Sequence, residues 1–86
     1  MTKLENYCYP AIFTYEPNQE IAVVFPDLHC ATSGTNDADA LLSAKELLLC
    51  VLNGMKDDEK PITPPTPLSE INIQDNEHAV LIDVST

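Results

Sequence analysis

The chain opens with two apolar runs on either side of a polar turn, a pattern typical of a β-hairpin. Residues 7–16 are rich in aromatic and β-branched side chains, and residues 21–25 are almost all apolar. Pro17 and Asn18 between them suit a turn. We therefore predict two antiparallel strands, the second with neighbours on both sides. Pro10 cannot donate a ladder hydrogen bond, which places the first strand at an edge or Pro10 near its start.

The stretch from residue 25 to residue 40 connects this hairpin to a helix. Pro26 and Asp27 end the second strand, and residues 30–33 are long enough for a short third strand. Gly34 is expected to supply the conformational freedom for the turn into the helix. Asn36 is a good N-cap, and Asp39, three residues later, completes an approximate capping box.

The helix is predicted from apolar residues at helical spacing: Ala38, Leu41, Leu42, Leu48, Leu49, Leu52 and Met55. Residues 47–52 are apolar all the way round, as in a helix buried on several sides or shared with another subunit. In so small a domain we favour the second explanation, a homo-oligomer (dimer or higher) formed through the helix. Asn53 and Gly54 are expected to begin the helix stop.

A proline-rich segment and a last strand complete the pattern. Four prolines within residues 61–67 forbid a helix and favour an extended connector. Ile71 and Ile73 suit a short extended contact, and residues 79–84 have enough apolar side chains for a central or well-covered strand. The predicted fold is α+β, in the order β-β-β-α-β: a small antiparallel-rich sheet with one helix packed across it.

Length and charge limit the possible functions. Eighty-six residues are expected to form a single domain, residues 1–86. A net charge of −10 repels nucleic acids and anionic membranes and favours a basic partner. The cysteines have no paired spacing, the first residues have no apolar leader, and the longest apolar run is far shorter than the roughly 20 residues of a membrane span. These features indicate a cytoplasmic protein with no membrane segment.

The sequence offers little chemistry, so we expect neither enzymatic activity nor a cofactor or metal. Asp37 and Asp39 are explained by the helix start, and Asp83 is the only acid flanked by strand residues. His29 and Cys30 are adjacent, and in a strand they would point to opposite faces, which suits no base–nucleophile pair. With two glycines in the chain, no nucleotide-binding fingerprint is possible.

In its order of elements the chain resembles the HicB-type antitoxin family, over roughly residues 7–84. The matching features are Tyr9-Pro10 in the first strand, an apolar strand ending in Pro26-Asp27-Leu28, the turn His29-Cys30, Gly34 ahead of a capped helix, the proline-rich exit and the final apolar strand. The family usually has glycine where this chain has His29. Many members continue into an operator-binding segment, whereas this chain stops at Thr86: it is either a single-domain member or a chain without that DNA-binding tail. The resemblance therefore carries no autorepression over to these residues, and we expect no nucleic-acid binding by this segment alone.

The resemblance implies a degenerate ribonuclease H-like fold and a non-catalytic role. It implies an antitoxin of a type II toxin–antitoxin system that neutralises a small, basic, mRNA-cleaving HicA-type toxin by covering it. From their positions at the turns that flank the hairpin, the candidate contact residues are Glu16, Glu20, Asp27 and His29; each also suits an ordinary solvated loop. Two alternatives remain: a vestigial ribonuclease H-like domain with a metal-dependent or ligand-binding role, and a plain oligomerisation module.

Overall fold

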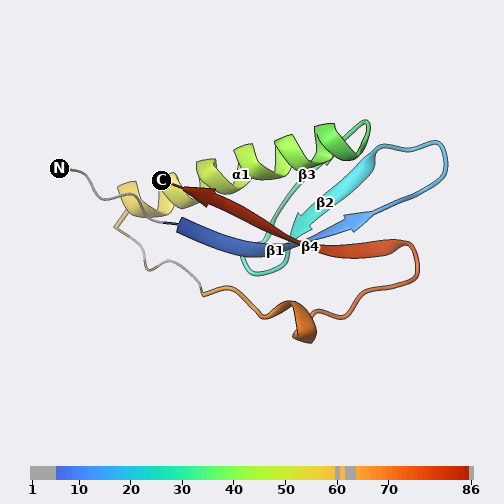
Figure 1. Cartoon of the computed structure of the whole chain (residues 1–86). Helices are drawn as coiled ribbons and strands as arrows, with labels where there is room; N and C mark the ends of the chain where they lie inside the picture. The colour runs from blue at the N-terminus through green and yellow to red at the C-terminus, as the bar shows by residue number, and fades with distance from the viewer. Residues whose placement is uncertain (1–5, 60, 62–63, 86) are drawn as a thin grey trace.

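A computed structural model describes residues 6–59, 61 and 64–85 of the chain (Figure 1). The elements follow the order β1 (Asn6–Thr14), β2 (Ile21–Phe25), β3 (Cys30–Gly34), α1 (Asp37–Asp57), a short 3-10 helix η1 (Leu68–Glu70) and β4 (Glu77–Ser85). This is the predicted α+β arrangement, β-β-β-α-β, and the predicted strands and helix are each present with small shifts at their ends.

The four strands form one antiparallel sheet in the order β3-β2-β1-β4. β2 has strand neighbours on both edges, as its apolar sequence predicts. Of the two alternatives predicted for the last strand, a central position is wrong, because β4 is an edge strand. β4 is well covered on one face only, where Ile82 and Val84 are buried. Pro10 is the fifth of the nine residues of β1, and β1 lies between β2 and β4, so both predictions for Pro10, an edge strand or a site near the strand's start, are wrong. The proline is tolerated there because the part of β1 that pairs with β2 begins only at Ile12.

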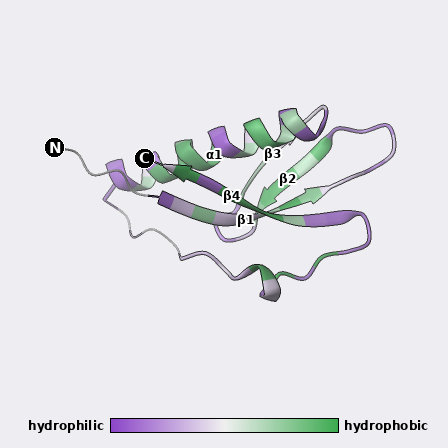
Figure 2. Ribbon diagram, in the orientation of Figure 1, coloured by the Kyte–Doolittle hydropathy of each residue, from purple (hydrophilic) through white to green (hydrophobic). Residues whose placement is uncertain are grey.

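The hydrophobic core lies between α1 and one face of the sheet. Alternate residues of the strands point into it, and α1 contributes residues spaced four apart along one stripe. The buried core residues are Tyr9, Ala11, Phe13, Ile21, Val23, Phe25, Leu28, Ala40, Ala44, Leu48, Leu52, Ile82 and Val84. Of the predicted helical series, Ala38, Leu41 and Leu42 are exposed instead. Figure 2 shows the hydrophobic residues alternating with polar ones along α1.

The start of α1 is built as its sequence predicts. The side chain of Asn36 accepts a hydrogen bond from the backbone N–H of Asp39 (2.9 Å), which makes Asn36 the N-cap. In return, Asp39 Oδ2 accepts from the backbone N–H of Thr35 (2.9 Å) and from its hydroxyl group (3.2 Å). In a usual capping box this carboxylate would accept from the N-cap residue, Asn36. Here it accepts from Thr35, the residue before the N-cap.

Gly34 is needed for a different reason from the predicted one. Its φ is not positive, so the turn does not use glycine's conformational freedom. Instead, a Cβ atom at Gly34 would lie 2.3 Å from the backbone nitrogen of Ala40. Glycine is required because the first turn of α1 packs directly against this backbone.

The helix continues past the predicted stop at residues 53–54 and ends at Asp57. The Lys56 ammonium lies 5.2 Å from the centre of the Tyr7 ring, a cation–π distance that fastens the last turn to β1. In the all-apolar part, Leu48 and Leu52 are fully buried, and Leu47, Leu49 and Val51 pack against the same core. This domain's own core therefore accounts for most of that part, and a homo-oligomer through the helix stays a prediction.

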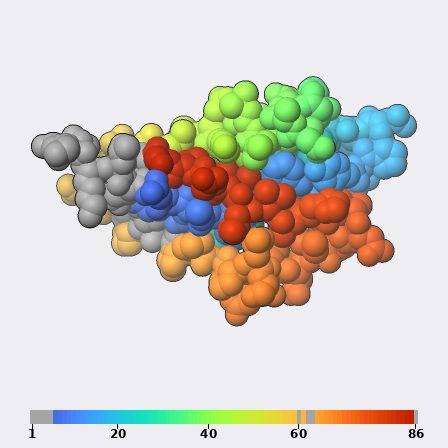
Figure 3. All heavy atoms as spheres, viewed as in Figure 1, coloured from blue at the N-terminus to red at the C-terminus, as the bar shows by residue number. Residues whose placement is uncertain are grey.

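The proline-rich segment and η1 run along the side of the sheet opposite α1, and residues 61 and 64–76, as far as the structure describes them, are here called the linker (Figure 1). The space-filling view shows the linker packed against β1 and β4 (Figure 3). Ile71 is half-buried, whereas Ile73 is exposed. No helix among the described residues is long and apolar enough to cross a membrane.

Candidate protein interface

The turn between β2 and β3 holds two of the candidate contact residues. His29 is exposed and has a φ of 52°, in the left-handed region that glycine enters most easily. Histidine thus occupies a backbone position that suits glycine, and β3 still forms directly after it. The next residue, Cys30, lies half-buried on the core side, where burial raises the pKa of its thiol.

Asp27, in the same turn, fixes the linker. Its carboxylate accepts hydrogen bonds from the backbone N–H of Thr66 (2.9 Å) and from the Thr66 hydroxyl group. Burial, and secondly the nearby Asp27 carboxylate, raise the pKa of the Tyr9 phenol. Asp27 is only half-exposed, so much of its hydrogen-bonding capacity serves the fold.

The other two candidates lie at the opposite end of β2. Glu16 and Glu20 are exposed in the turn of the hairpin, and Glu16 Oε1 accepts from the Asn76 side chain (3.2 Å). Five residues of β2 separate this pair from Asp27 and His29, a span of about 15 Å at the usual strand rise. The four candidates therefore form two groups at the two ends of β2 rather than one cluster.

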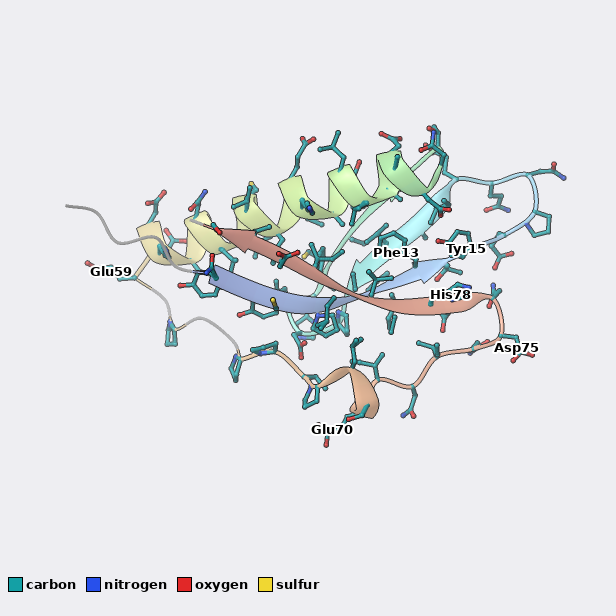
Figure 4. The ribbon with its side chains drawn as sticks, viewed as in Figure 1. Phe13, Tyr15, Glu59, Glu70, Asp75 and His78 are labelled. Atoms are coloured by element: carbon teal, nitrogen blue, oxygen red, sulfur yellow. The ribbon has the colours of Figure 1, made fainter. Side chains whose placement is uncertain are left out.

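Tyr15 contacts both Asp37 and His78 at the end of the sheet near the hairpin turn. The Tyr15 hydroxyl group donates to Asp37 Oδ1 (2.8 Å), and the Tyr15 ring meets the His78 ring edge-on at 5.4 Å between centroids. Figure 4 shows Tyr15 and His78 beside one another near Phe13. The hydrogen bond to Asp37, followed by burial, raises the pKa of Tyr15. These contacts join β1, β4 and the start of α1, so their role is structural.

The face of the sheet opposite α1, here called the outer face, also has apolar side chains, and it is not among the sites predicted from the sequence. Cross-strand register places Ala79, Ile12, Val24 and Ala31 in one row across all four strands. Leu81 pairs with Pro10 in the next row. The sequence did contain a signal for this face. Residues on both faces of β2 are apolar, although a single helix can cover only one face of a sheet.

Charge is distributed unequally between the two sides of the molecule. Among the described residues, both lysines, Lys45 and Lys56, lie on α1. The described strands, turns and linker have no lysine or arginine, but they hold the acids Glu16, Glu20, Asp27, Glu70, Asp75, Glu77 and Asp83. Figure 4 shows Glu70 and Asp75 on the linker, away from α1. Every charged side chain named on the strands, turns and linker is therefore an acid.

The described residues contain no pocket and no group of three or more histidine, cysteine or acidic side chains that could hold a metal ion. Asp83, the one strand acid considered as a metal ligand, is exposed and pairs with Cys8 of β1. What the described surface presents is a partly covered apolar sheet face with carboxylates at the ends of its strands.

Comparison with known proteins gives a structural neighbour. No protein-family model matches the chain, and neither does any curated protein. Among solved structures, the chain is similar to a chain of a structure described as "Toxin-Antitoxin complex from Streptococcus pneumoniae". The TM-score is 0.83 at 20% sequence identity, over 92% of this chain and 69% of the other. At this identity the likeness shows that the two chains share a fold.

Proposed function

We propose that this protein is the antitoxin of a type II toxin–antitoxin pair and that it neutralises a small basic toxin by direct protein binding. The observation that carries the proposal is the shared fold with a chain of a toxin–antitoxin complex, at a TM-score of 0.83 over 92% of this chain. The HicB-type order of elements in the sequence supports the same role. In that family the partner is a HicA-type ribonuclease that cuts messenger RNA with a histidine.

The electrostatics favour the antitoxin over the toxin of such a pair. A toxin that acts on messenger RNA must approach a polyanion, which a chain of net charge −10 opposes. An acidic chain is suited instead to a basic, RNA-binding protein, since opposite potentials accelerate association and select the right partner. We therefore assign this chain a non-catalytic role in the cytoplasm, without a cofactor and without nucleic-acid binding of its own.

Co-expression with the adjacent gene tests this proposal. We expect a neighbouring short reading frame for a basic protein with a prominent histidine, whose expression alone arrests growth. Co-expression of the present chain should relieve the arrest, and the two proteins should purify as one complex. If the neighbour stays toxic and unbound in the presence of the folded chain, the proposal is wrong.

A second assay separates neutralisation from catalysis. The purified chain should leave RNA intact in the presence of Mg²⁺ or Mn²⁺. Metal-dependent cleavage that disappears in Asp83→Asn would contradict the antitoxin proposal and support an active ribonuclease H-like domain instead.

A further inference from the structure

The outer face has an open apolar part that the linker does not cover. Pro10 lies on this face and is fully buried. The linker packs on this side of β1 and β4 (Figure 3). Further along the sheet, toward β3, the cover ends. Val24 is 38% exposed, and Ala22 and Ala31 are also exposed. On the far side of β1, Leu81 of β4 is 50% exposed.

Acidic groups border this apolar part at each end. Glu20 directly precedes β2 and Asp27 follows it, so the exposed Val24 lies between them along the strand. On β4, Glu77 and Asp83 lie at opposite ends of the same face as Leu81. An apolar centre with a charged rim is the usual anatomy of a protein–protein interface.

The charge pattern identifies the occupant. A second copy stacked face to face on this surface would bring two sets of carboxylates together, with no described lysine on either sheet to offset them. Nucleic acid would meet the same repulsion from its phosphates. A basic protein with an apolar contact patch would gain both from burying Val24 and its neighbours and from pairing with the rim carboxylates.

We propose that the outer face around Val24, Ala22 and Ala31 is the docking surface for the basic partner, an inference that rests on the proposed function and names its interface. The basic partner makes no contact with the opposite surface, the exposed part of α1. Of the four candidate residues from the sequence, Glu20 and Asp27 then act as rim charges that guide association.

A matched pair of lysine substitutions tests the surface. Val24→Lys places a bulky positive charge on the outer face, and Leu42→Lys places the same group on α1, where Leu42 is 57% exposed. Each full-length variant is titrated by calorimetry with the purified product of the adjacent reading frame. Circular dichroism and thermal unfolding check that each variant is folded, and Ala31→Lys provides a second outer-face variant.

We expect Val24→Lys and Ala31→Lys to weaken binding by about tenfold or more, and Leu42→Lys to change it by less than about twofold. Binding that is lost in Leu42→Lys and kept in the outer-face variants would overturn the proposal and place the interface on α1. Equal binding by all folded variants would also overturn it, while the proposed function would stand. Failure of the wild-type chain to bind would instead overturn the proposed function, and this inference with it.

Discussion

The two faces of the sheet are built from the same strands but have different roles. On the core face, Phe13, Val23 and Ile82 are buried under α1. On the outer face, the neighbouring residues Ile12, Val24 and Leu81 are also apolar, yet the linker covers this side only in part. One face therefore stabilises the fold, and the other is left with apolar surface for binding. Substitutions at paired positions should separate these roles.

The largest difference is expected between truncations on the two faces. Leu48→Ala removes a fully buried side chain at the centre of α1 and should lower the free energy of unfolding by about 3 kcal/mol. Val24→Ala, on the outer face, should lower it by less than about 1 kcal/mol. Urea unfolding followed by circular dichroism measures both. Similar losses at the two positions would contradict the division into a core face and a binding face.

The two glycines offer a second matched pair. Gly34→Ala would place a Cβ 2.3 Å from the Ala40 nitrogen and should destabilise the fold by about 2 kcal/mol. Gly54→Ala lies in the last turn of α1, where the added Cβ would meet no atom within 4 Å, and should instead stabilise the fold by about 0.5 kcal/mol. Thermal unfolding of both variants checks the opposite signs. A stabilising Gly34→Ala would show that α1 does not pack closely on β3.

The cover of the outer face depends on Asp27. Asp27→Ala removes the acceptor of both hydrogen bonds from Thr66 and should cost about 1–2 kcal/mol. Hydrogen exchange at the Thr66 amide should become faster. Glu20→Ala, an exposed acid at the other end of β2, is the control and should change stability by less than about 0.5 kcal/mol. An unchanged exchange rate at Thr66 would mean that the linker is held by other contacts.

The smallest effect concerns alkaline pH. The pKa of Tyr15 is raised above its ordinary value of 10.0, chiefly because its hydroxyl group donates to Asp37. The folded chain therefore keeps the phenolic proton at pH values at which the unfolded chain has lost it, and stability falls as the pH rises above about 10.

In Tyr15→Phe, the part of the stability loss at alkaline pH that comes from Tyr15 should disappear. At neutral pH the variant should have a free energy of unfolding lower by about 0.5 kcal/mol, because the hydrogen bond to Asp37 is missing. Stability curves of the two proteins between neutral and alkaline pH check this. Tyr9 remains in both and supplies a common background, because its pKa is also raised. Parallel curves would show that Tyr15 does not contribute.

Local chemistry in the sequence predicted the elements and the helix start. Strand alternation, the Asn36 cap and the Asp39 carboxylate act over a few residues, so their pattern is visible along the chain. Asn18 in the hairpin turn, with a φ of 60°, is also as expected. The close approach at Gly34 and the pairing of Asp27 with Thr66, 39 residues away, depend on tertiary packing, and no local pattern predicts them.

The candidate site was predicted only in part for the same reason. The prediction that turn residues are exposed is confirmed for Glu16, Glu20 and His29, because loop polar residues are usually solvated. Which apolar strand residues stay uncovered depends on where β4 and the linker lie. The apolar composition of residues 79–84 suggested a central or well-covered strand, but β4 is at the edge, and only one face of it packs on the core.

Methyl NMR of the wild-type chain during titration with its basic partner tests the central claim most directly. The Val24 methyl groups report on the outer face, and the Leu41 and Leu42 methyl groups report on the exposed side of α1. We predict large shifts or broadening at Val24 and little change at Leu41 and Leu42. The opposite result, with the changes confined to Leu41 and Leu42, would contradict the account and assign binding to the helix.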